Sequence, residues 1–180
     1  MGSKNILNTE REIKIEVIFT QDKEYQVIMA MRKAHPYEEI AYGVISLENK
    51  NQYTGAGMLG ELENELSESG FLKLLKAEMK TDCIRHTSLL NKNIKKIAIC
   101  GGSGSFLLQK AIRAQADVLV TADFKYHQFF EAEDKILIAD IGHYESEQFT
   151  GEIFYEVLSN KFPNFALHLT AINTNPIKYY

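Results

Sequence analysis

The stretch Lys135-Ile136-Leu137-Ile138-Ala139-Asp140-Ile141-Gly142-His143-Tyr144-Glu145-Ser146-Glu147 combines a buried strand with a cluster of polar side chains. The apolar run over 136–141 has the length of a strand and predicts one. If a helix begins near Gly142, His143 and Glu147 lie one turn apart on the same face. Imidazole nitrogen and carboxylate oxygen suit Zn, Mn, Fe or Co. The pair is therefore either two metal ligands or an ordinary capping pair at a helix start.

Strands and helices alternate on both sides of this stretch. We predict strands over 94–100, 117–122, 136–141 and 165–171, and helices over 105–114, 124–131 and 146–160. This order is typical of an α/β fold with a mainly parallel sheet and helices on both faces.

The first part of the chain shows a different organisation. Apolar positions predict a long helix over 61–80, split near Gly70, and a small βαβ-like unit made of a strand over 13–19, a helix over 22–33 and a strand over 41–47. The turn-rich residues 50–57 mark the boundary between this unit and the rest.

A glycine-rich turn, Gly101-Gly102-Ser103-Gly104, follows the strand over 94–100. Such a turn before a helix either cradles an anion such as phosphate or serves only as a tight structural turn. It is not a dinucleotide fingerprint, because Leu107 stands where the third glycine should be. A nicotinamide-dependent enzyme is therefore disfavoured.

Polar side chains also follow the strand over 117–122. Asp123 is either a helix N-cap or a catalytic group, and Tyr126 and His127 are candidates for substrate binding or proton transfer. The carboxyl ends of parallel strands meet at one edge of a sheet. We therefore expect these residues, the glycine turn and His143 to face one pocket.

Composition excludes several classes of protein. The net charge of −4 disfavours general nucleic-acid binding. No apolar run is long enough to cross a bilayer, and the first residues lack the apolar core of a signal peptide. The two cysteines, Cys83 and Cys100, fit reduced core thiols of a cytoplasmic protein, with a disulfide or thiolate site as the alternative.

The chain resembles a known family through ordered motifs. These are His35-Pro36-Tyr37-Glu38-Glu39-Ile40-Ala41-Tyr42, Gly55-Ala56-Gly57-Met58-Leu59-Gly60-Glu61-Leu62, Cys100-Gly101-Gly102-Ser103-Gly104, Asp123-Phe124-Lys125-Tyr126-His127 and Gly142-His143-Tyr144-Glu145-Ser146-Glu147. They look like the C-terminal portion of the Nif-three-like family, also named GTP cyclohydrolase 1 type 2 homologues, in its YqfO-type branch with an inserted ferredoxin-like (CutA/PII-like) domain.

The resemblance implies a centre of two divalent metal ions in an α/β fold that assembles as a toroidal hexamer. The family's ligands are a His-His pair, an Asp, and the His and Glu of the Gly-His-x-x-x-Glu turn, which map onto His143 and Glu147. The sequence contains no His-His dipeptide. The resemblance thus implies an incomplete metal site and a domain order of a tag-like start over 1–12, a partial insert over 13–50 and the C-terminal α/β half over 51–180.

Two functions follow from this resemblance. The first is a metal-dependent hydrolase acting on GTP, or on another phosphorylated or cyclic-amide small molecule, as a homo-oligomer. The second is a non-catalytic metal-binding module that acts in oligomerisation or regulation.

Overall fold

The computed structural model describes residues 11–49 and 54–180. The chain divides into two compact units, Met1–Lys50 and Asn51–Tyr180. Within the described residues, no helix is both long and apolar enough to cross a membrane.

The second unit contains a five-stranded mixed sheet with the strand order β1-β3-β4-β5-β2. The strands are β1 (Met58–Ser67), β2 (Arg85–His86), β3 (Asn93–Ser103), β4 (Val118–Ala122) and β5 (Leu137–Asp140). The three central strands run parallel, whereas β1 and β2 pair antiparallel to β3 and β5 at the two edges. The prediction of an α/β fold is confirmed, but a mainly parallel sheet is wrong, because both edge strands reverse direction.

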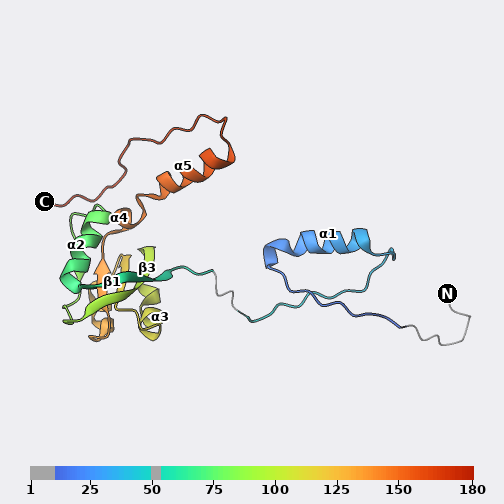
Figure 1. Cartoon of the computed structure of the whole chain (residues 1–180), viewed down its shortest axis with the longest axis horizontal. Coiled ribbons are helices and arrows are strands. Elements are labelled where there is room, and N and C mark those ends of the chain that lie inside the picture. Colours follow the sequence, from blue (N-terminus) through green and yellow to red (C-terminus); the bar gives the residue numbers. More distant parts are fainter. Residues whose placement is uncertain (1–10, 50–53) are drawn as a thin grey trace, which may run out of the picture. The chain divides into compact units, whose positions relative to one another are not determined.

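Helices cover both faces of this sheet. They are α2 (Glu68–Glu78), η2 (Ser105–Leu107), α3 (Leu108–Arg113), η3 (Tyr126–Ala132) and α4 (His143–Glu147). The remaining helix of this unit, α5 (Thr150–Lys161), buries no residue and extends away from the sheet, as Figure 1 shows. Figure 1 shows α2 and α3 on opposite sides of the strands. Because both faces are covered, every residue of β4 and β5 is buried.

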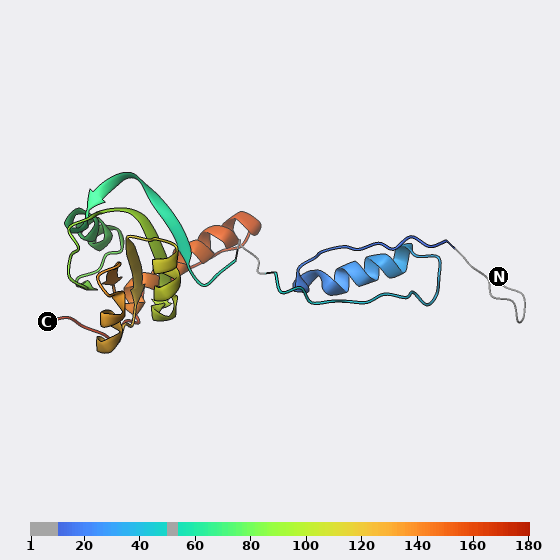
Figure 2. The same ribbon diagram turned by 90° about the horizontal axis from the view of Figure 1, so that it is seen from below.

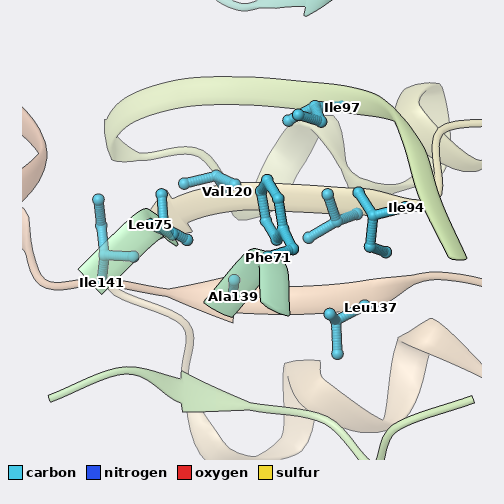
Figure 3. Packing of buried hydrophobic residues seen from close by; sticks show 9 residues of the cluster. Phe71, Leu75, Ile94, Ile97, Val120, Leu137, Ala139 and Ile141 are labelled. Atoms are coloured by element: carbon cyan, nitrogen blue, oxygen red, sulfur yellow. The ribbon is translucent and has the colours of Figure 1, made fainter. Parts of the chain in front are cut away.

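Alternate residues of the central strands face two separate apolar clusters. On one face, Phe71 and Leu75 of α2 pack on Val120 and Leu137, as Figure 3 shows. On the other face, Leu108 of α3 packs with residues that include Leu119, Ile136 and Ile138. This alternation is the period of two that a strand imposes on its side chains.

The helix predicted over 61–80 is wrong in its first third. Residues Met58–Ser67 form the edge strand β1, and α2 begins only at Glu68, where the Ser67 hydroxyl caps the helix by accepting from the Gly70 N–H at 3.2 Å. Leu62 and Leu66 pack against the core from this strand. Their spacing of four fits one face of a helix and one face of a strand equally well, so periodicity could not distinguish the two.

The helix predicted over 146–160 is two helices. α4 covers His143–Glu147 and α5 covers Thr150–Lys161. The expected last strand over 165–171 is also wrong, since these residues form neither strand nor helix. A strand requires a neighbour that satisfies its backbone groups, and within residues 54–180 this segment has none.

The first unit contains η1 (Gln21–Lys23) and α1 (Glu24–Ala34). The strands predicted over 13–19 and 41–47 do not form; both segments are extended without ladder pairing. Figure 2 shows the two segments separated from one another along the length of α1, and Figure 1 shows both on the same side of that helix. None of residues 11–49 is buried. The ferredoxin-like character of this unit therefore stays a prediction.

Candidate metal site

The candidate site lies where the three parallel strands end. β3 contributes Gly102 near its last residue, Asp123 directly follows β4, and His143 begins α4 three residues after β5. Parallel strands connected through helices bring their carboxyl ends to one edge, which is why positions far apart in the sequence meet here.

The His143 ring lies between two carboxylates. Its Nδ1 is 2.6 Å from Oδ2 of Asp123, and its Nε2 is 3.3 Å from Oε2 of Glu147. An ionised carboxylate only accepts hydrogen bonds, so the Nδ1–H donates to Asp123. In the neutral ring, Nε2 is then a bare acceptor that faces a second acceptor on Glu147. A proton on Nε2, or a metal ion bound by both atoms, would remove the repulsion between these two acceptors.

The two carboxylates favour the charged ring. The hydrogen bond to Asp123 is the main cause that raises the pKa of His143 above its ordinary 6.5, and the charges of Asp123 and Glu147 add to it. Partial burial opposes this rise. About half of each of the three side chains remains exposed, 49% for His143, 47% for Asp123 and 50% for Glu147, so water screens these charges.

Gly102 leaves room for this pair of side chains. A Cβ at Gly102 would lie 2.6 Å from Oε1 of Glu147 and 3.3 Å from Nε2 of His143, and the backbone φ of +60° also favours glycine. The Gly102 N–H donates to the Ser146 hydroxyl at 2.8 Å, and that hydroxyl donates to the His143 carbonyl at 2.8 Å. The glycine turn therefore contacts the start of α4 directly.

The other residues of the glycine turn have different surroundings. Gly104 packs closely on Cys100, since a Cβ on Gly104 would lie 2.7 Å from that of Cys100. Gly101 lies beside Glu147, with its ideal Cβ position 3.6 Å from Cγ of Glu147, and Ser103 is exposed. Because the Gly102 N–H is already engaged by Ser146, an anion would have to use other donors. Anion binding by this turn stays a prediction.

Tyr126 and His127 are exposed residues at the start of η3. The Tyr126 ring packs edge-on against Phe130, with centroids 5.4 Å apart. Of the residues predicted from the turn after β4, only Asp123 contacts His143 in the described part of the chain. Roles for Tyr126 and His127 in substrate binding or proton transfer stay predictions.

Neither cysteine forms a disulfide: Cys83 is free and exposed, and Cys100 is free and buried. The environment of Cys100 bears on its reactivity. Its Sγ lies 3.2 Å from the Ala56 carbonyl, and burial is the main cause that raises the pKa of this thiol, with the Glu147 charge adding to it. A thiol held protonated in this way is a poor nucleophile and a poor metal ligand.

His143 and Glu147 fit a metal ion as part of a ligand set. Metal-binding imidazoles ordinarily donate their second ring N–H to a carboxylate, as His143 does to Asp123. Across residues 11–49 and 54–180, however, no group of three or more His, Cys, Asp or Glu side chains is placed to hold an ion. Within the described residues, His143 and Glu147 are therefore two candidate ligands, fewer than the three or four that protein zinc sites ordinarily use.

A cavity of about 600 Å³ adjoins these two ligands. Its lining includes His143 and Glu147 together with Leu169, Ile172 and Ile177 of the C-terminal segment. A space of this size lies in the range that small-molecule ligands occupy. Polar and apolar groups therefore meet beside the candidate ligands.

Comparison with known proteins establishes the family to which this chain belongs. A family model described as Duf34/NIF3 (NGG1p interacting factor 3) matches residues 4–176. The chain belongs to the Duf34/NIF3 family.

Individual relatives agree with this assignment. The chain is 32% identical over 183 residues to the "GTP cyclohydrolase 1 type 2 homolog" of Halalkalibacterium halodurans, covering 99% of this chain and 49% of that protein. The Bacillus subtilis protein of the same name is 34% identical over 145 residues, covering 80% of this chain and 39% of that protein. The crystal structure of a Bacillus cereus protein related to NIF3 superimposes with a TM-score of 0.72 at 31% identity, covering 90% of this chain and 46% of that one. The chain thus spans about half the length of the curated relatives it matches.

Several residues that shape the site were not predicted from the sequence. Ser146 connects the glycine turn to α4. Asp140 accepts from the N–H groups of Phe124 and Gly142, the residues after Asp123 and before His143. Arg85 donates to the Phe124 carbonyl. A buried aspartate at the end of an apolar strand was the available signal for Asp140. Nothing in the local sequence pointed to Arg85, whose role depends on its pairing opposite Asp140.

Proposed function

We propose that this chain forms part of a metal-dependent hydrolase in which His143 and Glu147 hold a divalent cation, Zn, Mn, Fe or Co. The observation that carries the proposal is the pair of facing acceptors, Nε2 of His143 and Oε2 of Glu147, 3.3 Å apart. The Asp123 carboxylate supports it by fixing the protonated nitrogen of His143 on the far side of the ring.

When bound, a divalent ion supplies the Lewis acidity that activates water and polarises a substrate in hydrolysis. The residues of this chain orient the site. Asp123 sets the tautomer of His143, Gly102 leaves space for both ligands, and Ser146 fixes the start of α4 against the glycine turn. Two ions per site, which the family resemblance implies, require ligands beyond the two described here.

The proposed substrate is a small molecule, either a nucleotide such as GTP or another phosphorylated or cyclic-amide compound. The names of the relatives, "GTP cyclohydrolase 1 type 2 homolog", support the first choice. The cavity beside His143 and Glu147 supports a small ligand in general. The proposed location of the protein is the cytoplasm, and neither nucleic acid nor membrane is a proposed partner.

Metal binding can be measured directly. We expect titration calorimetry with Zn²⁺, Mn²⁺ and Co²⁺ to show binding to the full chain that His143→Ala and Glu147→Ala weaken by about tenfold or more. His35→Ala is the matched control, since it removes an imidazole from the other compact unit of the chain. Equal affinity in all these variants would contradict the proposal.

Catalysis is tested separately with GTP and simple phosphate esters, with and without a chelator. Turnover that depends on metal and is lost in His143→Ala supports a hydrolase. Stoichiometric metal without turnover supports the second candidate, a non-catalytic metal-binding module.

Homo-oligomerisation is part of both candidates, and α5 provides the observation that favours it. Ile153, Phe154, Val157 and Leu158 are between 38% and 62% exposed, and their spacing places them on one face of the helix. Exposed apolar clusters of this kind mark association surfaces. We expect sedimentation velocity to show an oligomer of the wild-type chain, which the double change Phe154→Asp and Val157→Asp dissociates.

A further inference from the structure

We infer that Asp140 and Arg85 form a positioning pair that sets the spacing between Asp123 and His143. The inference rests on the proposed metal-binding function of His143. Neither residue is a candidate ligand, and neither contacts the His143 ring; both act through the backbone of the two turns that carry the site.

One buried carboxylate connects the two turns. Asp140 ends β5 and is only 3% exposed. Its Oδ2 accepts from the Phe124 N–H at 2.9 Å, directly after Asp123, and its Oδ1 accepts from the Gly142 N–H at 3.2 Å, directly before His143. The two oxygens of one side chain thereby fix the backbone on both sides of the Asp123–His143 hydrogen bond.

Arg85 completes this arrangement from the edge strand β2. It pairs in register with Asp140, and its Nη2 donates to Oδ2 of Asp140 and to the Phe124 carbonyl, the latter at 3.1 Å. Its guanidinium also lies 5.6 Å from the centre of the Phe129 ring. Arg85 therefore supplies the positive charge that the buried carboxylate needs, and it also holds the backbone of Phe124.

The backbone geometry at Asp123 explains why such a pair is needed. Asp123 has a left-handed backbone with φ of 60°, which is unfavourable for a residue with a side chain, whereas Gly142 has φ of 95°, which glycine adopts readily. A non-glycine residue in the left-handed region persists only when surrounding contacts hold it there. Without these contacts, the Nδ1–H of His143 and the Asp123 carboxylate are free to separate, and the ring loses its fixed tautomer.

The test uses the full chain carrying Arg85→Met, Arg85→Lys or Asp140→Asn, with Lys135→Met as the control. Lys135 is a similarly exposed cation whose partner is Glu133, so its removal tests the loss of a surface ion pair alone. Three quantities are measured: Co²⁺ affinity by calorimetry, the urea unfolding midpoint, and the ¹⁵N signals of the His143 ring above the pH at which the ring titrates.

We expect Arg85→Met and Asp140→Asn to lower Co²⁺ affinity by about tenfold, while Lys135→Met leaves it unchanged. Arg85→Lys should recover part of the affinity because it restores the charge beside Asp140. In both weakened variants the ring signals should change from one defined tautomer to an average of two. Arg85 is largely exposed, so Arg85→Met keeps the test valid if Asp140→Asn fails to fold.

Two results would overturn the inference. One is an Arg85→Met protein with wild-type Co²⁺ affinity and an unchanged His143 tautomer. The other is an affinity loss fully explained by the unfolded fraction that the urea midpoint gives. If the wild-type chain binds no metal, the proposed function fails, yet the ring signals without metal still decide whether Asp140 and Arg85 position His143.

Discussion

Asp123 combines a left-handed backbone with a hydrogen bond to the His143 ring. Aspartate tolerates this conformation better than most residues, because its short polar side chain bonds locally. The Asp123 side chain therefore both suits the left-handed backbone and accepts the hydrogen bond that orients the His143 ring. At the residue scale, the site depends on few side chains, each placed by its own backbone geometry.

The charge state of His143 contributes to stability in a pH-dependent way. Its pKa in the folded protein is raised above 6.5, mainly by the hydrogen bond to Asp123. The added stability is therefore fully present below the pKa of the unfolded chain and is lost as the pH rises through the higher folded pKa.

We expect the difference in unfolding free energy between the wild type and His143→Gln, measured in urea with a chelator, to be largest at acidic pH. It should decrease as the pH rises above about 6.5, the ordinary histidine value. The effect should be small, because the ring is half exposed. A difference that grows toward alkaline pH would show that the Asp123 contact does not favour the charged ring.

Gly102 gives a second residue-scale prediction. Alanine there must adopt a left-handed backbone and place its Cβ 2.6 Å from Oε1 of Glu147. We expect Gly102→Ala to lose about 1–2 kcal/mol of unfolding free energy and to weaken metal binding.

Gly60→Ala is the control for this prediction, since nothing lies within 4 Å of its ideal Cβ position. Thermal unfolding and Co²⁺ calorimetry of the two variants provide the comparison. If both variants had the same unfolding temperature and the same Co²⁺ affinity, the absence of a side chain at Gly102 would not be required for the position of Glu147.

At the element scale, carboxylates that accept from backbone N–H groups join neighbouring segments of the chain. Glu68, in the first turn of α2, is 5% exposed and accepts from the N–H groups of Leu90 at 2.7 Å and Asn91 at 2.9 Å. Asp117 accepts in the same way from the N–H groups of Lys95 and Lys96. These contacts hold the loops that lead into β3 and β4.

We expect Glu68→Ala to lower the unfolding free energy by about 1–3 kcal/mol, because two backbone donors lose their acceptor. Glu78→Ala, at the exposed end of the same helix, should change it by less than about 0.5 kcal/mol. Urea unfolding measures both. A loss of the same size in the two variants would indicate a general effect of charge on α2 instead of the loop contact.

At the scale of the whole molecule, the two units differ in how much they bury. Within residues 11–49 no side chain is buried, whereas β4 and β5 of the second unit are buried throughout. Regions with few buried contacts open at low free energy, and core strands open only with the whole fold.

We therefore expect hydrogen exchange followed by mass spectrometry to show fast exchange over residues 11–49 and the slowest exchange over 118–122 and 137–140. Slow exchange over 13–19 and 41–47 would contradict this. It would show that these segments pair in solution, as the predicted ferredoxin-like unit requires.

The sequence alone determined the central strands and the proximity of two polar side chains that follow one of them. Long apolar runs bounded by turn residues, as in 136–141, are buried on both faces, so local composition predicts them well. The helical spacing of four residues likewise predicted that His143 and Glu147 are neighbours, and Nε2 of His143 lies 3.3 Å from Oε2 of Glu147. These features depend on residues close together in the chain.

Only the tertiary structure decided the direction of the edge strands, the strand character of Met58–Ser67, and the positioning of the site by Arg85 and Asp140. Each of these depends on which segment lies beside another across a long separation in sequence. A leucine spacing of four permits helix or strand, and pairing with β3 selects the strand. Likewise, Asp140 can hold two turns only because folding brings both turns and Arg85 within hydrogen-bond distance of its carboxylate. Hydrogen bonds act over a few ångströms in space, so separation along the chain does not predict them.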